Sequence, residues 1–231
     1  MSRLAVDLVA FDLTGTVVMD SGVMESALKG ALRDHGVPFT REDLSAMRGA
    51  GKMAAFSVLL GRSVGVDKSP DWVHSLAVEI HSTFKAKLRE EYARGSVQEI
   101  SGAGTVMRWL REKGIKVAAT TALDMDVAGA LLARLGWTEG IFNCVVSTEE
   151  VPQGRPAPYM IFLAMMRTDV VDVRRVMVVG DTAHDLMAGT NGGAGWVVGV
   201  MTGAHSRESL AATPHTHLLE SVADLPGILA R

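Results

Sequence analysis

Short apolar runs alternate with amphipathic segments along most of this chain, and this rhythm restricts the fold more than any other feature of the sequence. The runs cover 6–11, 115–120, 142–147, 176–179 and 196–200, and all contain Val or Ile. Such runs have the length and composition of buried parallel strands. Amphipathic segments such as 104–113 and 126–135 lie between several of them. We therefore expect an α/β fold with a doubly wound parallel sheet.

The stretch from residue 20 to residue 96 interrupts this rhythm. Amphipathic helical patterns occupy it at 22–35, 41–47, 52–60 and 70–92, without a convincing strand. We interpret the stretch as a helical domain inserted after the first strand. On this interpretation, residues 1–19 and 97–231 form the α/β core domain.

The composition excludes several classes of function. With 231 residues, of which 48% are apolar and 21% charged, the chain can bury a full core, so disorder is not expected. A net charge of −3 gives no electrostatic basis for binding nucleic acid or an anionic membrane. The partner that we expect is therefore a small molecule. Cys144 is the only cysteine, which excludes an intramolecular disulfide and a thiolate zinc cluster and favours a reducing cytoplasm. Asp7 interrupts the first apolar stretch, so we expect neither a secretory signal nor a membrane span.

The first cluster of residues that could take part in a reaction follows the first predicted strand and covers residues 12–16 (DLTGT). Open α/β sheets bind ligands beyond the carboxyl ends of their strands, so Asp12 is a candidate nucleophile. Gly15 lets the chain turn sharply, and the exposed amides of such a turn can bind an anion. An Asx turn with a capping aspartate is the alternative without catalysis.

Two further clusters carry groups suited to a phosphate. Thr120 and Thr121 end the second predicted strand, where a hydroxyl and a backbone amide could hold a phosphate oxygen, although such residues most often cap a helix. Arg155 lies in 154–158 (GRPAP), whose prolines stiffen the loop and hold the guanidinium for bidentate recognition of phosphate. A surface arginine is the alternative.

The fourth cluster, 180–185 (GDTAHD), follows the fourth predicted strand. Asp181 and Asp185 have a helical spacing that lets both face one point. Two carboxylates near a third, Asp12, are explained by a cation among them, and Mg²⁺ is a hard divalent ion that prefers oxygen ligands. A helix cap explains Asp181 alone but not the set.

In this order the four clusters resemble the motifs of the haloacid dehalogenase (HAD) superfamily, whose members are mostly Mg²⁺-dependent phosphotransferases. The resemblance covers nearly the whole chain and implies a Rossmann-like core with a helical cap domain at 20–96. It implies that Asp12 attacks phosphorus, and that Asp12, the Thr14 carbonyl and Asp181 bind Mg²⁺, with Asp185 supporting the metal site. The residues implied to bind phosphoryl oxygens are Thr16, Thr120, Thr121 and Arg155.

Thr14 departs from the superfamily pattern. Phosphatases of this superfamily usually carry there a second aspartate, which acts as general acid and base. A threonine hydroxyl does not ionise near neutral pH, so the rate enhancement of about 10²- to 10⁴-fold from general acid and base catalysis is missing. Hydrolysis of ordinary phosphate monoesters should therefore be poor. Arg155 also stands where most members have lysine. Both departures, and the segment 151–156 (VPQGRP), resemble the phosphonatase, or phosphonoacetaldehyde hydrolase, branch, which cleaves a carbon–phosphorus bond.

The phosphonatase branch adds a cap lysine in a Met-Gly-x-x-Lys element. The matching segment here, 48–52 (RGAGK), keeps the glycine and the lysine and has Arg48 in place of methionine. The resemblance implies that Lys52 forms an imine with a substrate carbonyl, so that an enamine leaves and no acid is needed at Thr14. Burial, or a nearby cation such as Arg48, would favour the uncharged amine by lowering the pKa of Lys52. A solvated lysine at the start of a helix is the alternative.

The sequence thus predicts a hydrolase acting at phosphorus through an aspartyl phosphate, with phosphonoacetaldehyde or a related β-carbonyl phosphonate as substrate. One alternative is a phosphatase of the same superfamily in which Lys52 and Arg48 only bind the substrate. A dehalogenase is disfavoured by the Asp181 and Asp185 pair, and a metabolite-binding protein of low turnover stays open. The exact substrate, the pathway and the oligomeric state, a homodimer included, are not fixed by the sequence.

Overall fold

A sheet of six parallel strands forms the centre of this protein. In the computed structural model, which describes residues 6–19, 22–47, 51–94 and 97–229, the strand order is β3-β2-β1-β4-β5-β6. The strands are β1 (Leu8–Phe11), β2 (Lys116–Thr121), β3 (Cys144–Ser147), β4 (Val176–Gly180), β5 (Trp196–Val200) and β6 (His217–Leu219). This arrangement confirms the predicted doubly wound α/β fold.

The last strand, β6, is the one that the apolar pattern did not predict. It has only 3 residues, which are half-buried, and it pairs with β5 at the edge of the sheet. An edge strand of this kind needs little apolar surface, so its sequence carries a weak signal. The other strands begin and end within two residues of their predicted bounds.

The direction in which strands are added reverses at β1. Its neighbours are β2 on one side and β4 on the other, and both are parallel to it. In open α/β sheets such a switch point opens a crevice beyond the carboxyl ends of the strands. Asp12 follows β1 directly and Asp181 follows β4 directly, so the topology brings these carboxylates to the same crevice.

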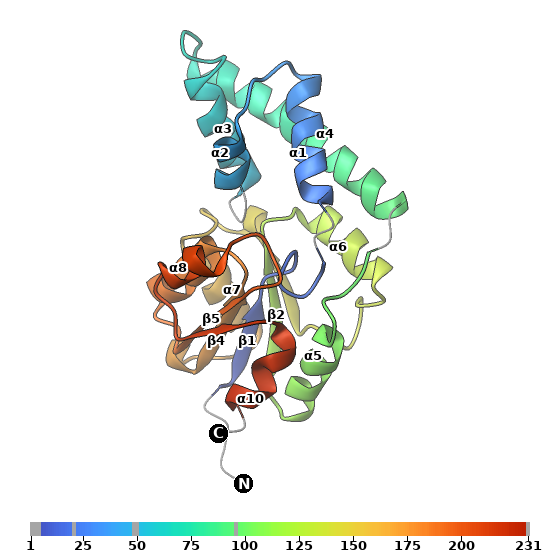
Figure 1. Cartoon of the computed structure of the whole chain (residues 1–231), viewed down its shortest axis with the longest axis vertical. Coiled ribbons are helices and arrows are strands. Elements are labelled where there is room, and N and C mark those ends of the chain that lie inside the picture. Colours follow the sequence, from blue (N-terminus) through green and yellow to red (C-terminus); the bar gives the residue numbers. More distant parts are fainter. Residues whose placement is uncertain (1–5, 20–21, 48–50, 95–96, 230–231) are drawn as a thin grey trace.

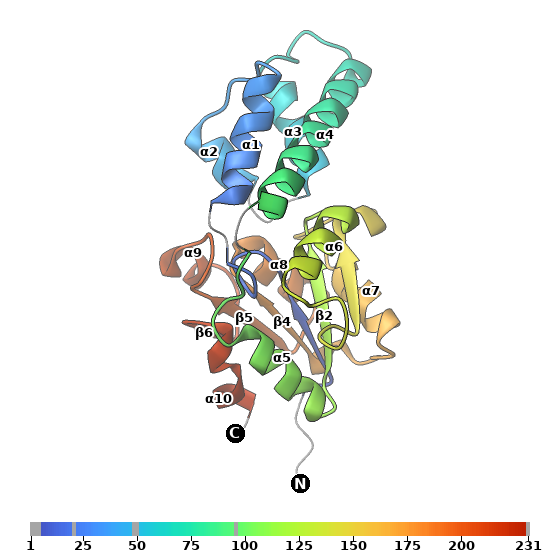
Figure 2. The same ribbon diagram turned by 90° about the vertical axis from the view of Figure 1, so that its right-hand side faces the viewer.

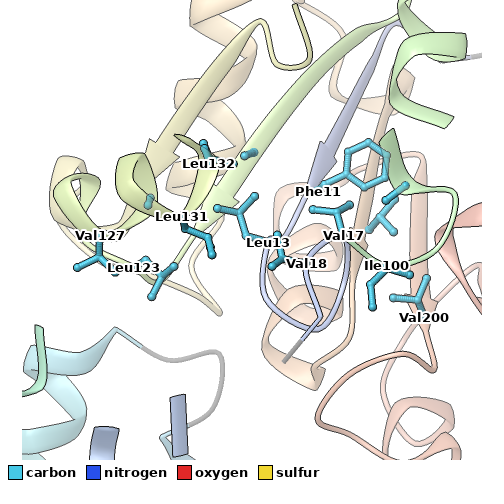
Figure 3. Close-up of a cluster of buried hydrophobic side chains, with 14 of the residues drawn as sticks. Phe11, Leu13, Val17, Val18, Ile100, Leu123, Val127, Leu131, Leu132 and Val200 are labelled. Carbon is cyan, nitrogen blue, oxygen red and sulfur yellow. The ribbon is translucent and has the colours of Figure 1, made fainter. Parts of the chain in front are cut away.

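Helices cover both faces of the sheet. Val9 and Phe11 of β1 pack in the larger cluster, which includes residues of α5, α6 and α10, whereas Leu8 packs with residues of α7 and α8. Figure 3 shows Phe11, Val17 and Ile100 within the larger cluster. The core helices are α5 (Ala103–Glu112), α6 (Met125–Arg134), α7 (Tyr159–Arg167), α8 (Ala183–Gly192), α9 (Arg207–Ala211) and α10 (Leu225–Leu229), with short 3₁₀ helices η1 (Thr148–Glu150), η2 (Val173–Arg175) and η3 (Val222–Asp224).

The regular elements in the described part of 20–96 are helices, as predicted. They are α1 (Val23–Asp34), α2 (Arg41–Ala46), α3 (Lys52–Arg62) and α4 (Pro70–Arg94). Phe56 of α3 and Phe84 of α4 pack edge to face, with ring centroids 6.0 Å apart. Figures 1 and 2 show these helices as a group beyond the carboxyl ends of the strands, on the side opposite to both chain termini. In the ranges that the structure describes, none of the helices has the length and apolar character needed to cross a membrane.

Candidate active site

A tight turn after β1 holds Asp12 at the crevice. The Asp12 amide donates to the Val179 carbonyl at 2.9 Å, so its backbone is anchored to β4. In the turn that follows, Gly15 has a φ of 91°, which residues with a Cβ rarely adopt. A Cβ at Gly15 would also lie 2.5 Å from Oδ2 of Asp181. Gly15 therefore allows the turn at 12–16 to pack directly against Asp181 of the fourth cluster.

Asp181 is buried under this turn, with 1% of its surface exposed. Its Oδ1 accepts a hydrogen bond from the Thr16 hydroxyl at 3.0 Å, and its Oδ2 accepts one from the Ala204 amide at 2.7 Å. Burial, together with the neighbouring Asp12 carboxylate, raises the pKa of Asp181 to about 7. The Thr16 hydroxyl is thus engaged with a carboxylate, and its contact with phosphate stays a prediction.

Arg155 joins two of the candidate carboxylates. It is 7% exposed, and its Nη2 donates to Oδ1 of Asp12 at 2.7 Å and to the Thr120 carbonyl at 3.0 Å. Its Nη1 donates to Oδ1 of Asp185. The surface-arginine alternative is therefore wrong. The guanidinium orients the Asp12 carboxylate, and its predicted contact with phosphoryl oxygens stays a prediction.

Asp185 lies in the first turn of α8 and supports Arg155 from there. Its Oδ2 accepts hydrogen bonds from the amide of Thr182 at 3.0 Å and from the hydroxyl of Thr182 at 2.5 Å, which forms a capping box. Because Oδ1 accepts from Arg155, both oxygens of Asp185 already have protein donors. Asp185 therefore fixes the direction of the guanidinium.

The two threonines after β2 face different surroundings. The hydroxyl of Thr120 donates to the Phe11 carbonyl at 3.4 Å, so this side chain points into the sheet. Thr121 lines a small chamber together with Asp12, and its hydroxyl accepts from the Leu123 amide at 3.1 Å. Of these two threonines, both predicted to bind phosphate, Thr121 is the one that lines the chamber.

Lys52 comes from the inserted helices. It is the first residue of α3, is 5% exposed, and its Nζ donates to the Met47 carbonyl at 2.9 Å. Burial and the positive charge of Arg155 lower the pKa of Lys52 to about 8, although Asp12 and Asp124 act in the opposite direction. The positive end of α3 also disfavours a cation at this position. The solvated alternative for Lys52 is thus wrong, and Arg48 lies outside the described residues.

Lys52 and Asp12 line the same chamber, which has a volume of about 50 Å³. Thr14, Thr121 and Asp181 also contribute to its walls. The Thr14 hydroxyl is buried and has no hydrogen-bond partner among the described residues. The chamber therefore brings together an amine, a carboxylate and a hydroxyl, contributed by the inserted helices and the core.

The acidic residues at this edge fit a divalent metal ion. Asp12, Asp181 and Asp185 each offer an oxygen, and these atoms lie within 4.8 Å of one another. Hard cations such as Mg²⁺ prefer oxygen ligands of this kind. The raised pKa of Asp181 agrees with this fit, because burial and the Asp12 carboxylate disfavour its charged form and a bound cation would favour it.

Known proteins of similar sequence settle the family. A family model described as haloacid dehalogenase-like hydrolase matches residues 6–193. The chain belongs to this family. It is therefore an enzyme, a haloacid dehalogenase-like hydrolase, as the order of the four clusters predicted.

Individual relatives of this haloacid dehalogenase-like hydrolase carry two kinds of names. The phosphonoacetaldehyde hydrolase of Parabacteroides distasonis is 28% identical over 187 residues, which cover 70% of this chain and 69% of the relative. A protein of Dickeya dadantii named "Probable phosphatase IndB" is 30% identical over 224 residues, which cover 95% of this chain and 92% of the relative. The crystal structure of a hydrolase from Pseudomonas syringae has a TM-score of 0.83 at 19% identity, covering 97% of this chain and 98% of that one, which shows a shared fold.

One part of the site was missed by the sequence analysis. The loop after β5 packs on Asp181, because the Ala204 amide donates to it and Gly203 approaches so closely that a Cβ there would lie 1.9 Å from Oδ2. The loop follows a strand at the same edge as the other clusters, which was an available signal. It contains no carboxylate, lysine or arginine that would have drawn attention to it.

Proposed function

We propose that this hydrolase cleaves the carbon–phosphorus bond of phosphonoacetaldehyde or a related β-carbonyl phosphonate. The observation that carries this proposal is the chamber shared by Lys52 and Asp12, which offers an amine and a carboxylate to one small substrate. Thr14 supports it, because an enamine leaving group needs no acid at that position. The 28% identity to the phosphonoacetaldehyde hydrolase of Parabacteroides distasonis agrees with it.

Lys52 provides the electron sink in this reaction. Its neutral amine forms a bond to the substrate carbonyl carbon, and uptake of one proton from solvent with loss of water leaves a cationic imine. With a pKa of about 8, about a tenth of the Lys52 side chains are neutral at pH 7. At the ordinary lysine pKa that fraction would be below about a thousandth. Burial of Lys52 thus prepares it for this step.

Asp12 provides the nucleophile. Its carboxylate forms a bond to phosphorus while the carbon–phosphorus bond breaks, and the electron pair of that bond moves into the imine to give a neutral enamine. Water then attacks the aspartyl phosphate, which releases phosphate and restores the Asp12 carboxylate. Protonation of the enamine carbon and hydrolysis of the resulting imine release the aldehyde and restore Lys52.

The residues around Asp12 orient its carboxylate and bind the charged phosphoryl group. Arg155 fixes the Asp12 carboxylate, and Asp185 fixes Arg155. A magnesium ion, when held by Asp12, the Thr14 carbonyl and Asp181, supplies positive charge where the carboxylate approaches the anionic phosphoryl group. The side chains and amides that we assign to the phosphoryl oxygens are Thr16, Arg48, Thr120, Thr121 and Arg155.

We further propose that residues 20–96 are a cap domain on a core formed by 1–19 and 97–231. This division is supported by the chamber, which takes Lys52 from the insertion and Asp12 from the sheet. The two parts also meet at Asp124, whose carboxylate lies 3.3 Å from Nε2 of His81 and 2.7 Å from Nζ of Lys85. These contacts hold α4 over the start of α6 and so keep Lys52 near Asp12.

A phosphatase acting on another small phosphorylated metabolite is the second candidate function. The observation that favours it is the 30% identity to "Probable phosphatase IndB" over 95% of the chain, which is a longer match than the one to the phosphonoacetaldehyde hydrolase of Parabacteroides distasonis. In that case Lys52 binds the substrate by its charge and forms no imine.

The two functions are separated by comparing the parent with Lys52→Arg on phosphonoacetaldehyde and on an aryl phosphate. A guanidinium keeps the positive charge but cannot form the imine. We expect Lys52→Arg to lose nearly all cleavage of the phosphonate. If the parent ignores the phosphonate and hydrolyses the aryl ester well, the phosphatase function replaces the first proposal.

A further inference from the structure

A second, much larger cavity adjoins the chamber. Its volume is about 550 Å³, and Lys52 and Ala122 line both it and the chamber that contains Asp12. Cavities of about 300 to 1,000 Å³ are typical of sites that enclose organic ligands well above the size of a two-carbon aldehyde. The space beyond Lys52 therefore exceeds what phosphonoacetaldehyde fills.

The walls of this larger cavity are mainly apolar. Ala55 and Leu59 lie three and seven positions after Lys52 in α3, a spacing that places them on one face of the helix. This face extends from Lys52 for about 10 Å, at about 1.5 Å per residue. Met47 lines the cavity from the insertion, and Val151 and Pro152 line it from the core loop. A ligand group that extends from Lys52 thus meets aliphatic side chains.

Two of the acidic groups in the wall are already paired, and a third, Glu149, is exposed and repels an anion. The Asp43 carboxylate accepts hydrogen bonds from the amide and hydroxyl of Thr40 and forms an ion pair with Arg62. The Asp124 carboxylate is held by His81 and by Lys85. Among the described residues that line the cavity, the remaining cations are Lys52 and Arg155, which belong to the reaction centre. The described wall thus favours an uncharged group over a second phosphate or carboxylate.

We propose that this cavity binds an uncharged, apolar extension of the substrate, so that the substrate class is a 2-oxoalkyl phosphonate with several carbons beyond the carbonyl. The inference rests on the proposed function for the position of the carbonyl at Lys52. The apolar site itself depends only on the cavity and its walls, and it can be tested by binding without any reaction.

The probes are n-alkylphosphonates from ethyl to hexyl, which lack a carbonyl and so form no imine. Their affinity is measured by calorimetry on the full chain with Mg²⁺ present. Burial of each added methylene should tighten binding by about threefold to fourfold. Affinity that does not change with chain length would overturn the proposal. Tighter binding of an ω-carboxyalkylphosphonate than of the alkylphosphonate of equal length would overturn it too.

Ala55→Phe provides the matched variant, because it fills the cavity one helical turn beyond Lys52. We expect it to bind ethylphosphonate like the parent and to lose the gain from longer chains. Ala93→Phe is the control, since Ala93 is exposed on α4 and does not line the cavity. If Ala55→Phe keeps the full dependence on chain length, the extension does not enter this cavity and the proposal fails. The chain-length series on the parent stands even if Ala55→Phe does not fold.

Turnover separates this inference from the proposed function. We expect a higher kcat/KM for 2-oxooctylphosphonate than for phosphonoacetaldehyde. If binding tightens with chain length but neither carbonyl phosphonate is cleaved, the apolar site is supported and the proposed reaction fails. If phosphonoacetaldehyde is cleaved and the longer phosphonate neither binds nor reacts, the proposed reaction is supported and the apolar extension is wrong.

Discussion

Nη2 of Arg155 lies 2.7 Å from Oδ1 of Asp12, although 143 positions separate the two residues in the chain. Nη1 of the same guanidinium contacts Asp185 at the start of α8. The buried guanidinium of Arg155 therefore connects the proposed nucleophile, which follows β1, to the first turn of α8, which follows β4. The direction of the Asp12 carboxylate depends on this coupling.

Arg155→Met should reduce both stability and activity. The substitution leaves Asp12 and Asp185 buried without their cation, and loss of one partner from a buried pair costs about 3 to 5 kcal/mol. Turnover should fall by about a hundredfold or more, because small errors in position have effects of that size. Urea unfolding and steady-state assays measure the two effects. Arg155→Lys should be less damaging, and equal losses in both variants would contradict a role for positive charge.

The rate should depend on pH through Lys52. Its lowered pKa of about 8 means that the neutral amine becomes more abundant as the pH rises toward that value. We expect kcat/KM on phosphonoacetaldehyde to rise about tenfold per pH unit below pH 7 and to level off above pH 8. The residual activity of Lys52→Arg should lack this dependence. A profile that levels off below pH 6 would show that the neutral amine of Lys52 does not limit the reaction.

Thr14→Asp should increase the hydrolysis of phosphate monoesters. The change introduces a carboxyl group into the chamber with Asp12, where it can protonate a leaving alkoxide and activate water. Such groups contribute about 10²- to 10⁴-fold, so a gain of at least tenfold on an aryl phosphate is expected. Thr14→Asn is the control of similar size that cannot act as an acid. A gain of the same size in Thr14→Asn would rule out this explanation.

Removal of divalent metal should abolish turnover, and added Mg²⁺ should restore it. The reaction brings the Asp12 carboxylate toward an anionic phosphoryl group, and a cation is needed to reduce their repulsion. Asp181→Ala should raise the Mg²⁺ concentration required for half-maximal activity. Undiminished activity after exhaustive chelation would contradict the requirement for a metal and would favour a dehalogenase.

The strands β1 to β5 and the four residue clusters could be predicted because each leaves a local pattern, whereas the short edge strand β6 leaves almost none. The run before Asp12 is apolar and short, and the carboxylates of 180–185 follow another such run. The contact of Arg155 with Asp12 could not be predicted, because it depends on how the loop at 151–158 folds back over the sheet. Likewise, the larger cavity forms between α3 and that loop, and neither segment reveals the space when considered alone.

Trapping with borohydride tests the central claim, that Lys52 forms an imine with the substrate, most directly. The parent and Asp12→Asn are incubated with phosphonoacetaldehyde and borohydride, and the peptides are analysed by mass spectrometry. We predict a reduced adduct on Lys52 in both proteins. In Asp12→Asn the adduct should retain the phosphono group, because an amide cannot attack phosphorus and the carbon–phosphorus bond stays intact. Cleavage of phosphonoacetaldehyde by the parent without any adduct on Lys52 would contradict the proposed mechanism.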